Sequence, residues 1–223
     1  MNVPPEYQSG VRDGWRVVGP GNKQRYLVYN GNESSSVDQC GSLMDDVQTR
    51  LFKSAAFGRL IRAMTRVECS HVRSAARRFR PGLDHTVAHH ALLSTASVLD
   101  ATLCFAADDK KSRAEWASDD YGGFESYMAA ETHTDDAKQQ EVYRTHDDED
   151  GGSLLSVSAV HNSLNLVLRD PGTMRFVKYV SLFAPSSRYD IAAEYQISSI
   201  GAGGGLSDDD LQEQEAEDED IED

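Results

Sequence analysis

The histidines within residues 85–89 are the first candidates for metal chemistry in this sequence. A non-haem ferrous iron site takes two histidines and one carboxylate on adjacent strands, and its first pair is normally written His-x-Asp. Here Val87 stands two residues after His85, and Ala91 stands two residues after His89. The carboxylate that would balance the charge of the iron is therefore absent from both registers.

The elements that must position such residues are mainly strands. Residues 99–105 alternate strictly, which places Leu99, Ala101, Leu103 and Phe105 on one face and Asp100, Thr102 and Cys104 on the other. Similar patterns predict strands at residues 17–18, 25–29, 164–168, 175–183 and 191–197, separated by short turns. A mainly β jelly roll or barrel-like sandwich is the fold that these patterns predict.

A helix or helix pair is expected to support the strands, from Leu43 to about Arg66. Ser42 is its candidate N-cap, and Gly58 is the candidate join between two pieces. Apolar residues recur at three- and four-residue steps and predict one buried stripe, made of Leu43, Val47, Leu51, Leu60, Ile61 and Met64.

The charge is unevenly distributed along the chain. The formal net charge is −15, but eleven of the 37 acidic residues lie in 208–223, where there is no Lys or Arg. Residues 1–206 therefore carry 26 acids against 22 bases, a formal −4. This balance argues against direct nucleic-acid binding, which depends on Lys and Arg at phosphates. The basic group Arg73, Arg77, Arg78 and Arg80 divides over both faces of a strand, so a solvated strand edge is expected.

Composition also suggests the domain limits and the compartment. Residues 1–14 predict a flexible N-terminal segment, residues 15–200 one folded domain, and residues 201–223 a disordered acidic tail. The three cysteines are widely spaced and no signal peptide or membrane-spanning apolar run is evident, so reduced thiols in the nucleus or cytoplasm are expected.

Blocks of residues spread over 12–197 carry a resemblance to a known family. In chain order they are Gly14-Trp15, Gly19-Pro20, Lys23 to Leu27, Leu51 to Ser54 with Phe57, Arg77 to Asp84, Leu99 to Phe105, Gly122 to Met128, Asn165 to Gly172, Arg175 to Ser181 and Ser187 to Ile191. The sequence resembles the C-terminal domain of the eukaryotic prolyl 3,4-dihydroxylase family. These are iron and 2-oxoglutarate oxygenases with two double-stranded β-helix domains in tandem.

The resemblance implies a cupin-like double-stranded β-helix at residues 15–200 that lacks catalysis. In that family the N-terminal domain uses Fe(II), 2-oxoglutarate and ascorbate, so no cofactor and no catalytic residue is expected in this chain. The implied partners are that catalytic domain and ribosomal or regulatory proteins. Relatives act on a proline of a small-ribosomal-subunit protein, and some fungal members control protein degradation through the second domain.

The resemblance also supplies candidate site residues. In catalytic relatives a distal His precedes an Arg that binds the co-substrate, and here the nearest His, His161, lies three residues too early and on the opposite pleat phase. His89 and His161 are therefore degenerate metal candidates, while Arg175 or Lys178 could supply a cation for a carboxylate. Trp116 and Tyr121 are the candidate protein-binding aromatics. Simple packing of both rings beneath their loop is the alternative.

Two other functions stay open on the sequence. One is an oxygenase with unusual ligands, in which His85 or His89 acts with His161 on iron and Arg175 binds 2-oxoglutarate. The other is a pocket that holds a small carboxylate without turnover. Both differ from the leading hypothesis, a non-catalytic domain for stability and for recognition of substrates or partners.

Overall fold

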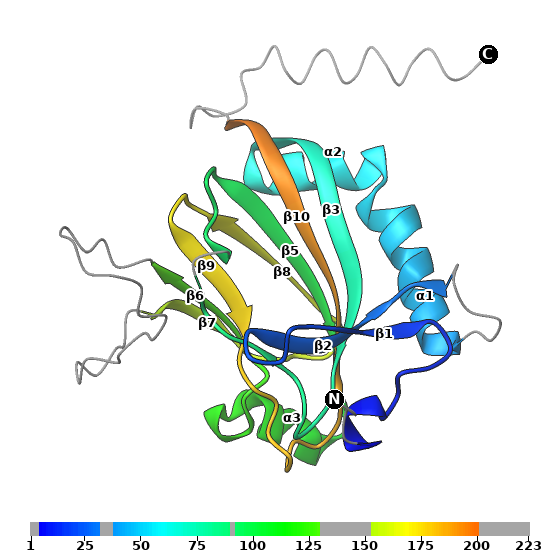
Figure 1. Ribbon diagram of the computed structural model, residues 1–223. Coiled ribbons are helices and arrows are strands. Elements are labelled where there is room, and N and C mark those ends of the chain that lie inside the picture. The colour runs from blue at the N-terminus through cyan, green and yellow to red at the C-terminus, as the bar shows by residue number, and fades with distance from the viewer. Residues whose placement is uncertain (1–4, 32–37, 90–91, 130–152, 201–223) are drawn as a thin grey trace.

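Two antiparallel β-sheets form the body of the domain (Figure 1). The computed structural model describes residues 5–31, 38–89, 92–129 and 153–200. Within them, the larger sheet has seven strands in the order β1-β2-β3-β10-β5-β8, with β4 paired to β2, and the smaller sheet has the order β7-β6-β9. The strands are β1 (Trp15–Val18), β2 (Gln24–Tyr29), β3 (Val67–Phe79), β4 (His85–Thr86), β5 (Val98–Phe105), β6 (Glu125–Ala129), β7 (Ser153–Val157), β8 (Ser163–Arg169), β9 (Thr173–Val177) and β10 (Arg188–Ile200).

The last of the described strands lies in the middle of the larger sheet. β10 pairs with β3 on one side and with β5 on the other, and its residues Ile191 and Ala193 are buried. The strands predicted near residues 17, 25, 99, 164 and 191 are confirmed. The strand predicted at 175–183 is shorter than expected, since β9 ends at Val177.

Two helices lie against the larger sheet, and they are α1 (Gln39–Val47) and α2 (Ala55–Thr65), joined by a π-helical turn at Gln48–Phe52. Asp38 caps α1 by accepting a hydrogen bond from the Gly41 amide at 2.7 Å. The expected cap, Ser42, is therefore wrong. Ser54 caps α2, so the two pieces join just before residue 55 and not at Gly58.

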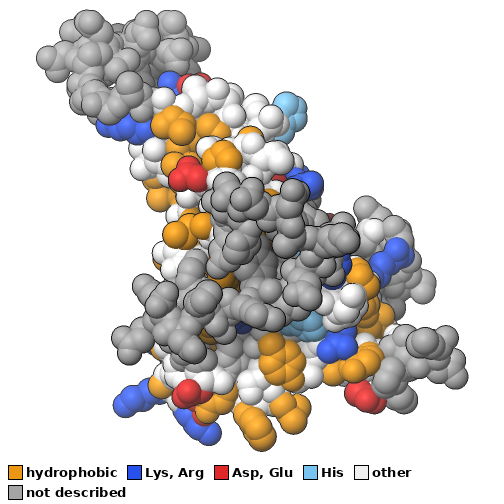
Figure 2. All heavy atoms as spheres, turned by 60° about the vertical axis from the view of Figure 1, so that its left-hand side comes forward, with side chains coloured by type: hydrophobic (Ala, Val, Ile, Leu, Met, Phe, Trp, Pro, Cys, Tyr) orange, Lys and Arg blue, Asp and Glu red, His pale blue; other side chains and the backbone are white. Residues whose placement is uncertain are grey.

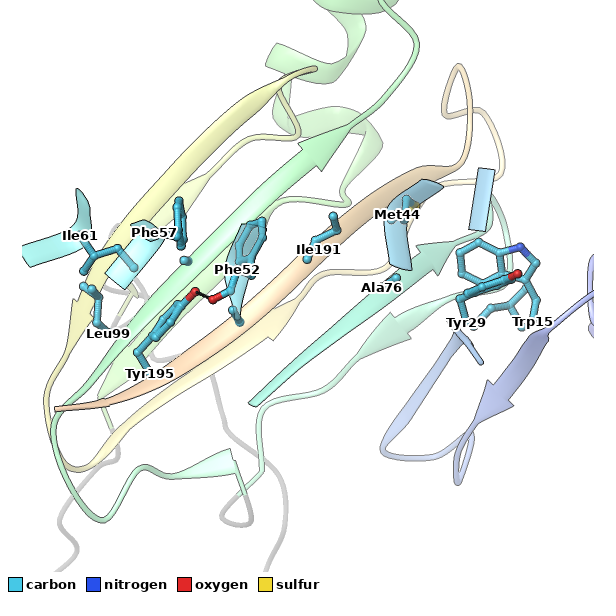
Figure 3. Close-up of a cluster of buried hydrophobic side chains, with 13 residues drawn as sticks. Trp15, Tyr29, Met44, Phe52, Phe57, Ile61, Ala76, Leu99, Ile191 and Tyr195 are labelled. Atoms are coloured by element: carbon cyan, nitrogen blue, oxygen red, sulfur yellow. Dashed lines mark hydrogen bonds between the residues drawn. The ribbon is translucent and has the colours of Figure 1, made fainter. Parts of the chain in front are cut away.

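The helices bury aromatic side chains against the outer face of the larger sheet (Figure 3). Phe52, Phe57 and Ile61 pack in one cluster with Leu99 and Tyr195. The Tyr195 hydroxyl donates a hydrogen bond of 2.6 Å to the buried Phe52 carbonyl.

The predicted apolar stripe of the helices is mostly wrong. Of its members Ile61 is buried and Val47 is half-buried, whereas Leu43, Leu51, Leu60 and Met64 are exposed. The π-helical turn and the break before α2 change the phase of the helical repeat, so a single stripe cannot run through both helices. The buried helix residues are instead Gly41, Met44, Gln48, Phe52, Phe57 and Ile61.

A second, smaller core lies where the sheets meet α3 (Lys110–Ala117), followed by a 3-10 turn at Asp119–Tyr121. Trp116 of α3 packs there with Phe79, Val177 and Val180. The chain turns beside this core at Gly122, where φ is +64° and an added Cβ would lie 1.9 Å from the Tyr179 carbonyl oxygen. Only glycine fits such a close approach at this φ.

The segment before β1 is held to the body through a buried arginine. Residues Pro5–Gln8 form a 3-10 turn, and the Arg80 guanidinium donates hydrogen bonds to the Tyr7 and Ser9 carbonyls at 2.9 and 2.6 Å. Arg80 is in turn paired with Asp84 at 2.7 Å. The domain limits at residues 14 and 200 stay predictions, and the acidic tail lies outside the described residues.

The facing sheets, with helices on the outside of the larger one, confirm the prediction of a mainly β jelly roll with supporting helices. Side chains of β6 and β9 reach those of β3 and β5, which shows that the two sheets enclose a common interior. None of the described helices has the length and apolar character that crossing a bilayer requires.

Candidate functional site

The interior between the two sheets is lined by charged and polar side chains. Asp100, Thr102 and Cys104 form the polar face of β5 that the alternation predicts, and all three are buried because this face is turned toward β6 and β9. Glu125 of β6 and Arg175 of β9 meet them from the smaller sheet.

Arg175 is fully engaged by groups of its own chain. Its Nε donates to Glu125 Oε1 at 2.7 Å, its Nη1 to Asp100 Oδ1 at 2.9 Å, and its Nη2 to Thr102 Oγ1 at 2.5 Å. The side chain is 11% exposed. Each guanidinium nitrogen therefore already has an acceptor, and the predicted role of Arg175 as the cation for a carboxylate ligand is not what this geometry offers.

Three further arginines extend the network. Arg169 bridges Asp100 at 2.8 Å and Glu194 at 2.5 Å. Arg77 donates two hydrogen bonds to Asp190, at 2.7 and 3.0 Å, and lies 3.6 Å from Glu125. Arg188 lies 3.0 Å from Asp190 as well. The four guanidinium groups are matched by four carboxylates, namely Asp100, Glu125, Asp190 and Glu194.

The position of Arg77 corrects the expectation of a solvated basic edge. β3 lies between β2 and β10 and so is not an edge strand. Arg77 points into the interior, while Arg78 points to the helix side, where its guanidinium lies 5.2 Å from the centre of the Tyr189 ring. The division over two faces is as predicted, but among these residues only Arg73 is largely in solvent, with 86% of its side chain exposed.

The electrostatics of the network favour ionised Glu125. Burial alone would raise the pKa of Glu125, but the nearby Arg175, Arg188 and Arg77 outweigh burial and lower the pKa to about 2. Burial raises the pKa of Asp100, against the opposing effect of Arg175 and Arg169. Burial also raises the pKa of the Cys104 thiol, to about 11, so this inward cysteine stays protonated at neutral pH.

His85 and His161 lie apart from this interior network. His85 lies beside Tyr179, with ring centres 6.4 Å apart, and burial and Arg25 lower its pKa. His161 packs edge-on against Phe105 and accepts a hydrogen bond from the Ala106 amide at 3.3 Å. Across the ranges with known placement there is no group of three His, Cys, Asp or Glu side chains that could hold a metal ion. The ferrous site that His85 or His89 would form with His161 is therefore not assembled, and the residues do not fit an iron centre.

A surface groove of about 610 Å³ lies between β4, the turn after α3, and the end of β9. Its lining includes His85, Tyr121, Phe124, Lys178 and Tyr179. The Lys178 ammonium lies 4.7 Å from the centre of the Phe124 ring.

Exposed apolar side chains continue the groove along its rim. Tyr179, Leu182 and Phe183 are exposed, and Phe183 has 81% of its surface in solvent. Figure 2 views the molecule from the side of the smaller sheet, and hydrophobic side chains gather at its lower end. Tyr179, Leu182 and Phe183 are close in the sequence, and grouped exposed apolar side chains are typical of a binding site for another protein.

The four predicted binding residues lie in three different places. Tyr121 and Lys178 line the groove together, whereas Trp116 is 3% exposed and belongs to the core beneath it. The alternative for Trp116, packing under the loop, is therefore what the structure shows. Arg175 belongs to the interior network. Sequence reasoning missed the acidic partners of that network, although Arg188 and Asp190, two residues apart in a strand pattern, were a readable signal.

The fold and the interior define a class, namely a double-stranded β-helix domain whose central cavity is filled by matched ion pairs. Residues 2–202 match the family described as oxoglutarate and iron-dependent oxygenase degradation C-term. The chain belongs to this family, as its sequence blocks suggested.

Named relatives agree with this assignment. The chain is 38% identical over 192 residues to prolyl 3,4-dihydroxylase OGFOD1 of Ostreococcus tauri, covering 85% of this chain and 36% of that protein. It is 29% identical over 182 residues to prolyl 3-hydroxylase sudestada1 of Drosophila melanogaster, covering 77% of this chain and 30% of that protein. This chain thus spans about a third of the length of the curated relatives it matches.

Among solved structures, a Pseudomonas putida prolyl-4-hydroxylase is similar with a TM-score of 0.42 and 10% identity, over 87% of this chain and 88% of that one.

Proposed function

We propose that this chain is the non-catalytic C-terminal domain of a peptidyl-proline hydroxylase of the nucleus or cytoplasm. The observation that carries the proposal is the network of ion pairs in the interior. There each of the three guanidinium nitrogens of Arg175 donates a hydrogen bond, to Glu125, Asp100 and Thr102. A co-substrate carboxylate would have to compete with two buried carboxylates for the same guanidinium. The interior is therefore built for rigidity instead of turnover.

The proposed role is recognition through the groove and its apolar rim. The first partner is the catalytic N-terminal domain of the same family, which would carry Fe(II), 2-oxoglutarate and ascorbate chemistry. Further partners are ribosomal or regulatory proteins, including a small-ribosomal-subunit substrate and components of regulated degradation. Support comes from family membership and from exposed Tyr179, Leu182 and Phe183 beside the cationic Lys178.

The test is a binding titration of this chain against the isolated catalytic domain of a family member. The double substitution Phe183→Asp with Lys178→Glu is expected to weaken binding at least about tenfold. It removes an aromatic side chain that the partner would bury and reverses a charge that would face the partner. Leu60→Asp, which also changes an exposed apolar residue but on α2, serves as the matched control and should leave the affinity unchanged.

Two results would overturn the proposal. One is equal binding by the groove variant and the parent chain. The other is Fe(II)-dependent decarboxylation of 2-oxoglutarate by this chain alone, with loss of turnover in His89→Ala. That second result would restore the oxygenase with degenerate ligands.

A further inference from the structure

The helix α2 and the turn before it carry an unbalanced basic surface in an acidic chain. Between Asp46 and Glu68 the sequence has five basic residues and no acidic residue. All five are exposed, and we name them the α2 basic surface: Arg50, Lys53, Arg59, Arg62 and Arg66. Arg62 lies 3.2 Å from Glu68, whereas the other four have no carboxylate at ion-pair distance among the residues whose placement is known.

A groove of about 490 Å³ runs beside this surface, between α2 and the adjoining ends of β3 and β10. Lys53, Arg59 and Arg62 line its helix side, and Glu68, His71 and Ser198 line its strand side. The exposed side chains of Leu60 and Met64 lie on the same helix. The exposed surface of α2 therefore combines positive charge with apolar area, which suits an acidic peptide segment.

The chain leaves the described fold at this groove. Ser198 lines it, and Ile200, the last residue of β10, pairs with Val67, which directly follows Arg66. The sequence then continues with six residues, Gly201 to Leu206, before the segment 207–223 with its eleven acids. Six extended residues reach about 20 Å, and the eleven residues of α2 span about 16 Å. The acidic segment can thus reach every part of the α2 basic surface.

We propose that residues 207–223 bind the α2 basic surface of their own chain and cover it. Eleven acids face five bases, so the sign and the number of charges are complementary. Single exposed ion pairs are weak, but a short glycine-rich connection gives the segment an effective concentration in the millimolar range. The bound tail would keep polyanions off the surface until a tighter acidic partner or high salt displaces it. This proposal is independent of the function proposed above.

The test uses a fluorescent peptide with the sequence of residues 207–223 and the full-length chain in two forms. In one form the tail is native, and in the other its eleven acids are replaced by Asn and Gln. The neutral-tail chain is expected to bind the peptide at least about tenfold more tightly, because its surface is not already covered. The affinity should fall steeply between about 20 mM and about 500 mM salt.

Charge reversal locates the binding surface. Arg59→Glu with Arg62→Glu in the neutral-tail chain should abolish peptide binding, and both residues are exposed, so the fold is preserved. Lys110→Glu with Lys111→Glu on α3 makes the same change in net charge at the other end of the molecule and should leave binding intact (Figure 1).

Three outcomes would overturn the proposal. The first is equal peptide affinity for the native-tail and neutral-tail chains. The second is peptide binding that survives reversal on α2. The third is a difference between the two chains in amide NMR shifts at α2 that grows with protein concentration, which would assign the contact to a second copy instead of the same chain.

Discussion

Arg175→Met is the substitution that tests the interior network most directly. Methionine keeps much of the length of the side chain but removes the three donors that now reach Glu125, Asp100 and Thr102. Glu125 keeps the more distant Arg77 at 3.6 Å and the hydroxyl donors of Thr102 and Tyr127 at 3.0 and 3.4 Å, and Asp100 keeps Arg169. The buried carboxylates of Glu125 and Asp100 thereby lose the guanidinium that now lies between them.

The size of the effect follows from the pKa of Glu125. Its folded pKa of about 2, against an ordinary 4.5, corresponds to about 3 kcal/mol of stability at neutral pH, and Arg175 contributes the largest share of the lowering, beside Arg188 and Arg77. Removing one partner of a buried ion pair costs about 3–5 kcal/mol, which is the same range. We expect a loss of about 3 kcal/mol and, at about 2–4 °C per kcal/mol, a fall in Tm of about 6–12 °C.

The sign of the pH dependence adds a second check. A carboxyl with a lowered folded pKa contributes its stability above pH 4.5 and loses it as the pH falls toward 2. The gap in free energy of unfolding between parent and Arg175→Met should therefore narrow over that window. Urea unfolding at several pH values measures it.

Arg73→Met is the matched control, because Arg73 also pairs with a carboxylate at 2.8 Å but is 86% exposed. It should cost less than about 1 kcal/mol. The double variant Arg175→Met with Glu125→Gln should recover part of the loss, since the unpaired charge is gone. Equal stability of Arg175→Met and the parent at pH 7 would refute this view of the network.

Two further substitutions test the packing, each by the change in the urea midpoint. Gly122→Ala should destabilise by several kcal/mol because its Cβ would meet the Tyr179 carbonyl oxygen at 1.9 Å, whereas Gly172→Ala, also at positive φ but with open space around it, should cost only about 1 kcal/mol. A similar cost at both glycines would contradict the close approach. Tyr195→Phe should cost about 1–3 kcal/mol by leaving the buried Phe52 carbonyl without its donor, and a neutral result would show that water replaces the hydroxyl.

Apolar alternation located β1, β2, β5, β8, β9 and β10, but it predicted no strand at β4, β6 or β7. Leu99 to Phe105 and Ile191 to Ile197 became β5 and β10 because alternation matches the pleat of a strand whatever the neighbouring strands are. The strand predicted at 175–183 extends too far, because β9 ends at Val177 and the apolar residues continue into an exposed loop. A run of apolar residues in an exposed loop therefore has the same sequence pattern as a buried strand.

The helical region was harder, since its boundaries depend on local capping. Asp38 and Ser54 start the helices, and the π-helical turn between them resets the phase of the repeat. The prediction of one apolar stripe through Leu43 and Leu60 assumed one continuous helix. It therefore placed exposed residues on the buried face. Sequence spacing carries no mark of an extra residue within a helical turn.

The interior network was only half visible from the sequence. Alternation separates Asp100 and Thr102 from their apolar neighbours, but it does not say whether water or a second sheet covers the polar face. The partners Glu125, Arg175 and Asp190 come from three other strands, at separations that no local pattern encodes. The resemblance indicated the class of fold, and only the three-dimensional pairing revealed what fills it.

The central place of β10 has a consequence for biosynthesis. Its last residue pairs with Val67, 133 positions earlier (200 − 67), so β3 and β5 have no neighbour along this seam until the final strand is made. Closing so long a loop is slow, and unpaired strand edges invite association between chains. A nascent chain stalled before residue 188 would thus leave the edges of β3 and β5 along this seam unpaired and open to association with other chains.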